Sequence, residues 1–456
     1  MLDQSFSAEN FRKILDIENR KGIYLEGEFY PDIDDINKKI KEINSSIRFL
    51  NKKGLSREDY NKEREKLNEK KEYLKTEKEE NLIKKLGVVS SVVTAPDFKL
   101  KIEIDATITD KPVYKTTRIL ENLLTLKQLQ YNFRKLYKVK QSNRYAIISH
   151  LKNLLDDGFP KTIIKTDIKE FYESIPHDKL LKKINDETLL THLSRRFIQQ
   201  ILKEYKDKSQ LADGVPRGIG ISPYLAELYM REVDAKIKSI PNVMYYARYV
   251  DDIIVIFMPH IDNTPRNYKQ EIKDVLKEEG LVMNEDDTKT RIIDLTDKSK
   301  NQRYDIEYLG YKFTSGYKDK KHISLALTIS GRKKKRYAGR LLKAFDLYQK
   351  HAKGNEKLAR KVFVKRIRFL MSNTRLINNK RNVITGIFYT NSLINTTEDF
   401  KLLDRFFKRL ITKFMLPTAL ATRISRDNSF EAGFNPTCIS KFNKIELYTI
   451  MQSWTK

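Results

Sequence analysis

The chain has one cysteine, Cys438, in 456 residues. A single thiol excludes an intramolecular disulfide framework and a cysteine-based metal site. Long apolar runs are also absent, since no stretch reaches the roughly 18 residues that a membrane-spanning helix requires. The opening segment, MLDQSFSAENFRKILDIENRKG, carries acidic residues and lacks the apolar core of a secretion signal. We therefore expect a cytoplasmic protein that does not enter a membrane.

Negative charge is scarce relative to positive charge. The sequence has 89 Lys and Arg residues against 61 Asp and Glu residues, a net charge of +28. Such an excess favours a polyanionic partner, and nucleic acid is the default. A lysine-rich bias of an AT-rich genome is the alternative, and the many Lys, Asn and Ile residues agree with part of it. Bias alone would raise Glu together with Lys, so nucleic acid remains the favoured partner.

The N-terminal region, residues 1–87, contains a predicted helical hairpin over residues 36–87. Apolar side chains recur there at spacings typical of a heptad seam. They are Ile33, Ile36, Ile40, Ile43, Ile47 and Leu50, then Tyr60, Leu67 and Leu74. Between the two series, Gly54 is a predicted C-cap and Ser56 a predicted N-cap. The arm is interpreted either as a solvated intramolecular hairpin or as a docking surface for protein or RNA.

The rest of the chain mixes strands and helices, which predicts an α+β protein. Residues 88–118 alternate as strands do, and residues 119–157 are mainly helical. Residues 159–320 combine both kinds of element and hold the candidate chemistry. Residues 321–456 are mainly helical and basic.

Three aspartates in two strand-like segments are candidate catalytic residues. The apolar segment TIIKTDI carries Asp167 near its end, and YYARYVDDIIVIF reads as a hairpin with its turn at Asp251 and Asp252. If these strands are neighbours, the three carboxylates converge, and they cannot all ionise in a dry site without cations. Two Mg²⁺ ions about 3.5–4 Å apart would neutralise them and catalyse in-line phosphoryl transfer. Taken alone, the Asp pair is more typical of an ordinary hairpin turn than of a catalytic site.

Four segments in order resemble the palm of reverse transcriptases. They are DIKEFYESI, GVPRGIGISPYLAELYM, YVDD, and MNEDDTKT followed by YLGYKF, which we interpret as a strand with a closely approached glycine. The resemblance is clear over about residues 140–313. It implies a right-hand polymerase, with fingers at 88–158, an antiparallel-sheet palm at 159–320 and a basic helical thumb at 321–456.

The resemblance also implies roles for single residues in the reaction. Asp167 and Asp251 would bind the two Mg²⁺ ions, with Asp252 as the third carboxylate. The backbone carbonyl of Ile168 would complete one metal's coordination. Lys289 matches a lysine that protonates the leaving pyrophosphate, and its alternative is a solvated loop lysine.

Further residues would bind the incoming nucleotide. Tyr172 stands where the family places an aromatic ring that clashes with a ribose 2′-OH; core packing is the alternative, although Phe171 is the expected core residue. Arg217 and Gly218 stand where many relatives carry Gln-Gly, and this departure puts base and template handling in doubt. Gly218 and Gly220 would let the backbone approach a base pair or sugar. Cations for the triphosphate are expected among Arg144, Arg118, Lys115 and Lys111, with no reason to choose one.

A basic run begins the last region and is predicted to contact nucleic acid. It comprises Arg332, Lys333, Lys334, Lys335 and Arg336. Phosphate contacts of this kind provide affinity without sequence choice. A solvated surface is the alternative.

Among reverse transcriptases, the segments resemble bacterial abortive-infection and defence-associated enzymes. The opening QSFSAENFRKILDIENRKG resembles, more narrowly, the shorter enzyme of type 3 two-polymerase antiphage systems. The resemblance implies RNA-directed DNA synthesis from dNTPs in antiviral defence, with a noncoding RNA and, in the narrower match, a second reverse transcriptase. The oligomeric state stays open. Two alternatives remain: an untemplated or protein-primed DNA synthase, and a noncatalytic RNA-binding scaffold.

Overall fold

The computed structural model describes residues 2–50, 56–105, 111–259, 266–376 and 383–455. The chain forms two compact units, each made of several segments. Unit 1 comprises residues 1–141, 169–236 and 274–282, and unit 2 comprises residues 142–168, 237–273 and 283–456. Within the described ranges, no helix combines the length and the apolar character needed to cross a bilayer.

Unit 1 is mainly helical. Its elements are α1 (Ala8–Arg20), α2 (Leu25–Phe29), α3 (Pro31–Leu50), α4 (Arg57–Thr94), β1 (Ile102–Asp105), β2 (Val113–Thr116), α5 (Leu120–Tyr137), α7 (Phe171–Ser174), α8 (His177–Asp186), α9 (His192–Ser209) and most of α10 (Ser222–Lys238). Strands β1 and β2 pair antiparallel.

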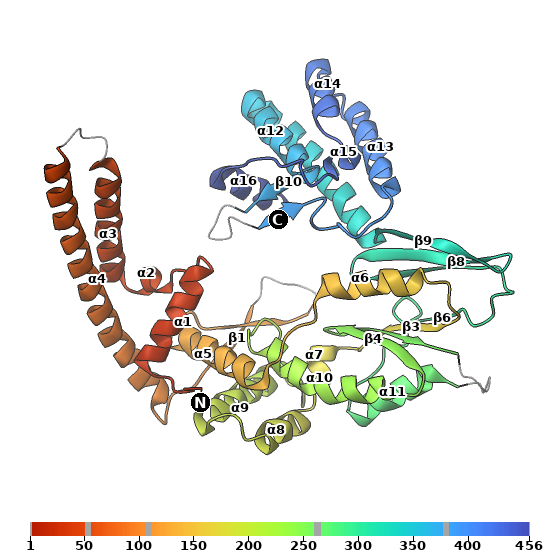
Figure 1. Ribbon diagram of the computed structural model, residues 1–456, viewed down its shortest axis with the longest axis horizontal. Coiled ribbons are helices and arrows are strands. Elements are labelled where there is room, and N and C mark those ends of the chain that lie inside the picture. Colours follow the sequence, from red (N-terminus) through yellow and green to blue (C-terminus); the bar gives the residue numbers. More distant parts are fainter. Residues whose placement is uncertain (1, 51–55, 106–110, 260–265, 377–382, 456) are drawn as a thin grey trace. The chain divides into compact units, whose positions relative to one another are not determined.

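The predicted helical hairpin is confirmed in α3 and α4, which lie side by side (Figure 1). Ile36, Ile43 and Leu74 form its buried seam, flanked by partly buried Ile40, Ile47 and Leu67. Ser56 caps α4, because its hydroxyl accepts a hydrogen bond from the Asp59 N–H. The predicted cap at Gly54 lies outside the described residues.

The prediction of strands from residue 88 onward is wrong for its first part. Helix α4 continues to Thr94 through the segment VVSSVVT. Leu82, Leu86, Val89 and Val93 are buried at spacings of three and four, and the helix contacts α1 and α5. Tertiary packing of one helical face therefore overrides the strand preference of these β-branched residues. The later part of the predicted strand region does form β1 and β2.

Unit 2 contains both larger sheets. Its elements are α6 (Arg144–Leu155), β3 (Thr162–Asp167), β4 (Val243–Tyr249), β5 (Asp252–Phe257), β6 (Arg291–Asp294), β7 (Gln302–Tyr308), β8 (Tyr311–Lys318), β9 (Lys321–Ile329), α12 (Gly331–Leu370), β10 (Asn373–Arg375), β11 (Ile384–Gly386), α13 (Glu398–Lys413), α14 (Thr418–Asp427), α15 (Phe430–Gly433) and α16 (Lys444–Thr455). Helix α11 (Tyr268–Glu278) has residues in both units.

The sheets of unit 2 are antiparallel. One has the strand order β4-β5-β3-β6 and the other the order β7-β8-β9. Ile163 in β3 and Ile254 and Ile256 in β5 enter a continuous apolar core with side chains of the second sheet and of α6 and α12. This core holds the strand ends that carry the aspartates. The structure is therefore of the predicted α+β class, while the fingers, palm and thumb boundaries stay predictions.

The prediction of a single strand over the segment IEYLGYKF is wrong. The segment forms the turn and the adjoining strand ends of a hairpin between β7 and β8. Leu309 and Gly310 form its two-residue turn, with φ of 45° and 77°. Such positive φ values at both positions match the twist of the flanking strands. Gly310 is also closely approached, as predicted, because a Cβ there would lie 2.8 Å from Arg144 Nη2 and 2.9 Å from Lys333 Cε.

Candidate active site

The strand register brings the aspartates to one end of the β4-β5-β3-β6 sheet. Asp167, the last residue of β3, pairs directly with Asp252, the first residue of β5. Asp251 lies in the short connection between β4 and β5, and its carbonyl accepts a hydrogen bond of 3.2 Å from the Ile168 N–H. The three candidate carboxylates thus belong to two adjacent strands and one turn.

The turn that carries Asp251 is braced by its own sheet. Val250 adopts a φ of 61°, which is unusual for a β-branched residue. The buried Arg248 donates a hydrogen bond of 2.8 Å to the Val250 carbonyl. Tyr308 donates one of 3.0 Å to the Asp252 carbonyl. These contacts fix a backbone conformation that the residues alone would not favour.

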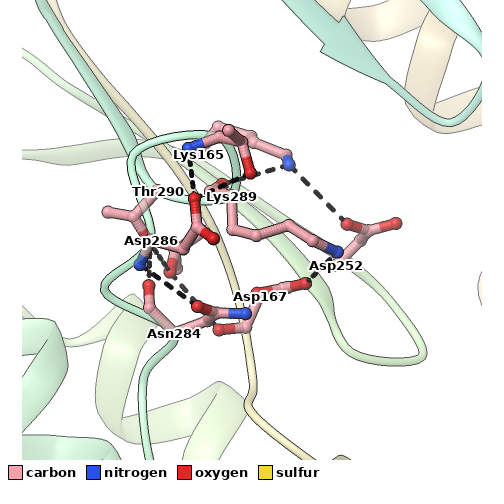
Figure 2. Close-up of polar contacts among 9 residues, drawn as sticks. Lys165, Asp167, Asp252, Asn284, Asp286, Lys289 and Thr290 are labelled. Carbon is pink, nitrogen blue, oxygen red and sulfur yellow. Dashed lines mark hydrogen bonds and ion pairs between the residues drawn. The ribbon is translucent and has the colours of Figure 1, made fainter.

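Two lysines face the carboxylates, as Figure 2 shows. Lys289 Nζ donates a hydrogen bond of 3.0 Å to Asp167 Oδ2. Lys165 Nζ lies 4.0 Å from Asp252 Oδ1 and donates a hydrogen bond of 3.1 Å to the Lys289 carbonyl. Lys165 is not among the site residues predicted from the sequence, although its place two residues before Asp167 puts it on the same face of the strand.

The loop that presents Lys289 is attached to strand β3 on both sides of that residue (Figure 2). After it, the buried hydroxyls of Thr290 and Thr166 are 2.6 Å apart and share a hydrogen bond. Before it, the Asn284 N–H donates a hydrogen bond of 2.9 Å to the Asp167 carbonyl. The position of the ammonium group relative to Asp167 is therefore set by the fold.

The pKa values report a crowded acidic site. Burial raises the pKa of Asp252, and repulsion from Asp251 and Asp167 adds to the rise, while Lys165 and Lys289 oppose it. The hydrogen bond to Asp167 raises the pKa of Lys289, and the nearby carboxylates add to this effect. The carboxylates therefore favour cations at this end of the sheet.

The carboxylates at this end of the sheet fit the ligand preference of Mg²⁺. Asp167 Oδ1 is buried, and no described residue donates a hydrogen bond to it. Carboxylate oxygens are the ligands that Mg²⁺ prefers, usually one or two of them with substrate phosphates completing the shell. Among the residues with described positions, no three acidic, histidine or cysteine side chains form a ready-made metal cluster. The buried Asp167 oxygen and its acidic neighbours Asp251 and Asp252 are the residues that would hold Mg²⁺.

A hollow of about 830 Å³ opens beside the aspartates. We call it the carboxylate hollow; its lining includes Asp251, Asp252, Lys165, Lys289, Glu307, Arg144, Lys333 and Arg336. Arg144 is the one of the four predicted triphosphate cations that lines it. Arg144 Nε is buried without a hydrogen-bond partner among the described residues. Its guanidinium lies over the Tyr311 ring, 5.6 Å from the centroid.

The predicted basic run forms the first turns of α12, so its side chains diverge. Arg332, Lys335 and Arg336 are exposed. Lys334 forms an ion pair of 2.9 Å with Asp399. Lys333 is buried and donates a hydrogen bond of 2.7 Å to Asn391 Oδ1, which corrects the interpretation of a uniformly solvated run. Burial, with repulsion from Arg144 and Arg336, lowers the pKa of Lys333 to about 7.

The predicted nucleotide-binding residues Tyr172, Arg217 and Gly218 belong to unit 1. Phe171 is buried, as expected for the core residue, and Tyr172 is half-buried. Arg217 Nε and Nη2 donate hydrogen bonds of 2.8 and 3.0 Å to the Glu173 carboxylate, and its guanidinium lies over the Tyr172 ring. Arg217 is therefore held by its own chain.

Gly218 is closely approached by another part of its own chain. A Cβ there would lie 2.4 Å from the Tyr114 carbonyl oxygen of β2. At Gly220 a Cβ would lie 2.3 Å from Gln130 Nε2. Both glycines thus pack against other parts of unit 1.

The remaining triphosphate candidates, Arg118, Lys111 and Lys115, also lie in unit 1. Arg118 forms a two-pronged ion pair with Glu28, with both distances 2.7 Å. Lys111 lies 3.6 Å from Glu170, and Lys115 lies 3.8 Å from Asp105. Each of these cations has a carboxylate partner in its own unit.

One family model and one curated relative match parts of this chain. Residues 106–313 match the family model described as "Reverse transcriptase (RNA-dependent DNA polymerase)". A curated relative, "Uncharacterized 91 kDa protein in cob intron" of Schizosaccharomyces pombe, is 32% identical over 87 residues, which cover 18% of this chain and 11% of that protein.

Similar solved structures include two yeast telomerases. Apo telomerase from Candida tropicalis aligns with a TM-score of 0.38 and 14% identity, covering 79% of this chain and 63% of that one. Telomerase from Candida albicans in complex with a TWJ fragment of telomeric RNA aligns with a TM-score of 0.33 and 15% identity, covering 84% and 66%. The chain spans less than two thirds of each of these relatives. By the match to the family model, residues 106–313 form a reverse transcriptase domain, the domain of RNA-dependent DNA polymerases.

Proposed function

We propose that this protein is a reverse transcriptase that copies RNA into DNA from dNTPs. The observation that supports it most is the direct pairing of Asp167 with Asp252 on adjacent strands, with Asp251 in the adjoining turn. The lysines that face this group belong to the same unit, as does the basic wall of the carboxylate hollow. The net charge of +28 supports a nucleic-acid substrate.

In this proposal, Asp167, Asp251 and Asp252 hold two Mg²⁺ ions, with the Ile168 carbonyl as a further ligand. The ions, when bound, stabilise the attacking and leaving oxygens of an in-line displacement. Lys289 protonates the pyrophosphate as it leaves, from a position that the Thr166–Thr290 contact maintains. Arg144 binds phosphate in the carboxylate hollow.

Nucleotide selection is assigned in the same proposal to residues that the resemblance matches. Tyr172 excludes the ribose 2′-OH, which makes the enzyme prefer deoxynucleotides. Arg217 holds the Tyr172 ring in place through its contact with Glu173. This role differs from that of a glutamine beside the base, and it accounts for the departure at that position in physical terms. The fingers, palm and thumb assignments of 88–158, 159–320 and 321–456 belong to this proposal.

The biological role that we propose is antiphage defence in a bacterial cytoplasm. It rests on the resemblance of the sequence segments to defence-associated reverse transcriptases. A noncoding RNA as template or scaffold, and a second reverse transcriptase as partner, follow from the same resemblance. Plaque counts on cells that carry the wild-type gene or its Asp251→Asn variant test this role, and equal counts would contradict it.

Primer extension by the purified full-length protein tests the enzymatic proposal. The assay contains an RNA template with a DNA primer, Mg²⁺ and dNTPs, and the products are sequenced. We expect template-directed DNA from the wild type, none from Asp251→Asn, and wild-type activity from Asp319→Asn, a control in an exposed turn of the same unit. Product that persists after RNA removal would indicate an untemplated synthase. Absence of product from the wild type would indicate a scaffold.

A further inference from the structure

A second cavity, of about 360 Å³, lies among the C-terminal helices of unit 2. Helix α12 contributes residues from both of its ends to the lining, and β10, β11 and α16 contribute further lining residues. Phe369, Leu370, Ile387 and Leu447 make its walls largely apolar. Its volume falls in the usual range for sites that bind small organic groups.

Two arginines of α12, Arg336 and Arg340, line the same cavity one helical turn apart. Neither forms an ion pair with a carboxylate among the residues whose positions are described. Burial lowers the pKa of Arg340, and repulsion from Arg336 lowers it further. The cavity therefore joins apolar walls to an excess of positive charge.

These properties select a ligand with a flat apolar part and an adjacent anion. The Arg340 guanidinium lies over the Trp454 ring, 5.2 Å from its centroid, and has no anionic partner among the described residues. A purely apolar ligand would leave both guanidinium groups without an anionic partner, and inorganic phosphate would leave the apolar walls unused. An unstacked nucleobase with its own backbone phosphate satisfies both, because proteins bind single strands by aromatic and apolar contacts to the base and basic contacts to the backbone.

The cavity is also linked to the carboxylate hollow. Arg336 lines both of them, and both lie in unit 2. A strand bound near the aspartates could therefore pass along α12 and place one base in the cavity. We propose that the cavity binds one unpaired base of a nucleic-acid strand, with the adjacent phosphate at Arg336 and Arg340. The identity of the strand rests on the proposed function.

Equilibrium binding of single-stranded DNA and RNA oligonucleotides to the full-length protein tests this proposal. One abasic residue is moved along each oligonucleotide in turn. If a base occupies the cavity, its removal at one position weakens binding about tenfold, as expected for the loss of one stacked base. The Met451→Trp variant fills the cavity from α16 and should abolish this position dependence.

Matched variants separate the cavity from general effects. Tyr448→Trp adds bulk to the exposed face of α16 and should behave as the wild type. Replacing the phosphate beside the critical base with an uncharged methylphosphonate should weaken binding to the wild type. Arg340→Gln should bind both oligonucleotides equally well, whereas Arg360→Gln, elsewhere on α12, should discriminate between them as the wild type does. Circular dichroism verifies folding, and Leu447→Phe replaces Met451→Trp if that variant fails to fold.

The proposal is overturned if no single base position matters, or if Met451→Trp leaves the position dependence intact. Competition by dAMP alone, without any base effect in the oligonucleotides, would identify a mononucleotide site instead and would also overturn it. The assay contains neither Mg²⁺ nor dNTPs. A failure of the cavity proposal is thus distinguishable from a failure of DNA synthesis, which primer extension reports separately.

Discussion

Two arginines of unit 1 and three basic residues that line the carboxylate hollow of unit 2 differ in their partners. In unit 1, Arg118 pairs with Glu28, and Arg217 pairs with Glu173. In the hollow, Arg144, Lys333 and Arg336 form no ion pair with any carboxylate that the structure describes. Glu307 also lines the hollow, and its carboxylate accepts a hydrogen bond from the Gly331 N–H at the start of α12.

This difference shows that an excess of positive charge is not one property of the whole chain. A guanidinium that its own chain already neutralises must break that contact before it can bind phosphate. A cation without a carboxylate partner gains its first strong partner when an anion arrives. The contrast therefore ranks Arg144 above Arg118 as a phosphate ligand, although the sequence treats them alike.

Substitution of Lys289 is expected to have the largest effect among the tests of this contrast. Lys289 is a paired cation, yet it lies beside the aspartates. If pairing always marked a purely structural cation, Lys289→Met would leave the reaction rate unchanged. We expect the rate of nucleotide addition at saturating dNTP to fall about hundredfold or more, the usual loss for a general acid. Single-turnover primer extension measures it. The control is Lys300→Met in an exposed loop, and a fall of less than about threefold would contradict the assigned role.

Lys333 tests the cost of a buried cation. Its pKa is lowered to about 7 in the folded chain, from an ordinary value of 10.5. Between these two values the unfolded chain binds more protons, so stability rises with pH across this window. We expect the wild type to gain about 2 kcal/mol over Lys333→Met between pH 7 and 9. Urea unfolding of both proteins measures the difference, and parallel pH profiles would rule out the lowered pKa.

Arg144 and Arg118 form a matched pair for phosphate binding. Arg144→Gln should raise the KM for dNTP about tenfold, because a charge-assisted contact is lost. Arg118→Gln should change it less than about twofold, since Glu28 already occupies that guanidinium. Steady-state primer extension measures both. Equal effects of the two substitutions would remove the distinction between the two groups of cations.

Substitution of Glu173 is expected to have the smallest effect, and that effect is on the stability of unit 1. Burial opposes ionisation of Glu173, but the contacts with Arg217 outweigh it and lower the pKa of the carboxyl. This stabilisation is present above the ordinary value near 4.5 and disappears as pH falls through the lowered pKa. Glu173→Gln should therefore cost about 1 kcal/mol at pH 7 and less at pH 3. Denaturant unfolding monitored in the helical signal reports it, and a cost that does not change with pH would refute the assignment.

Local sequence patterns predicted much of the candidate site. The apolar residues before Asp167 and on both sides of Asp251 predict three strands and a turn, and the observed register pairs Asp167 with Asp252. The seam of the α3–α4 hairpin followed in the same way from its periodic isoleucines. Each of these features depends on residues that are near one another in the sequence, where side-chain periodicity carries the information.

Contacts between distant residues were not predictable in this way. The pairing of Arg217 with Glu173 spans 44 positions, and that of Arg118 with Glu28 spans 90. Lys333 looks like its basic neighbours in the sequence, yet it alone in that run is buried against Asn391. Helix α4 continued through a β-branched segment because α1 and α5 cover one of its faces.

By itself, the sequence determined the α+β class, the strand-borne aspartates and the reverse transcriptase segments, because periodicity, turn chemistry and motif order are local properties. Only the tertiary structure decided which cations remain available to an anion and where an apolar cavity meets arginines. Those properties depend on burial and on partners far away in the chain. The free energy of a charge is set by its surroundings in space rather than by its neighbours in sequence.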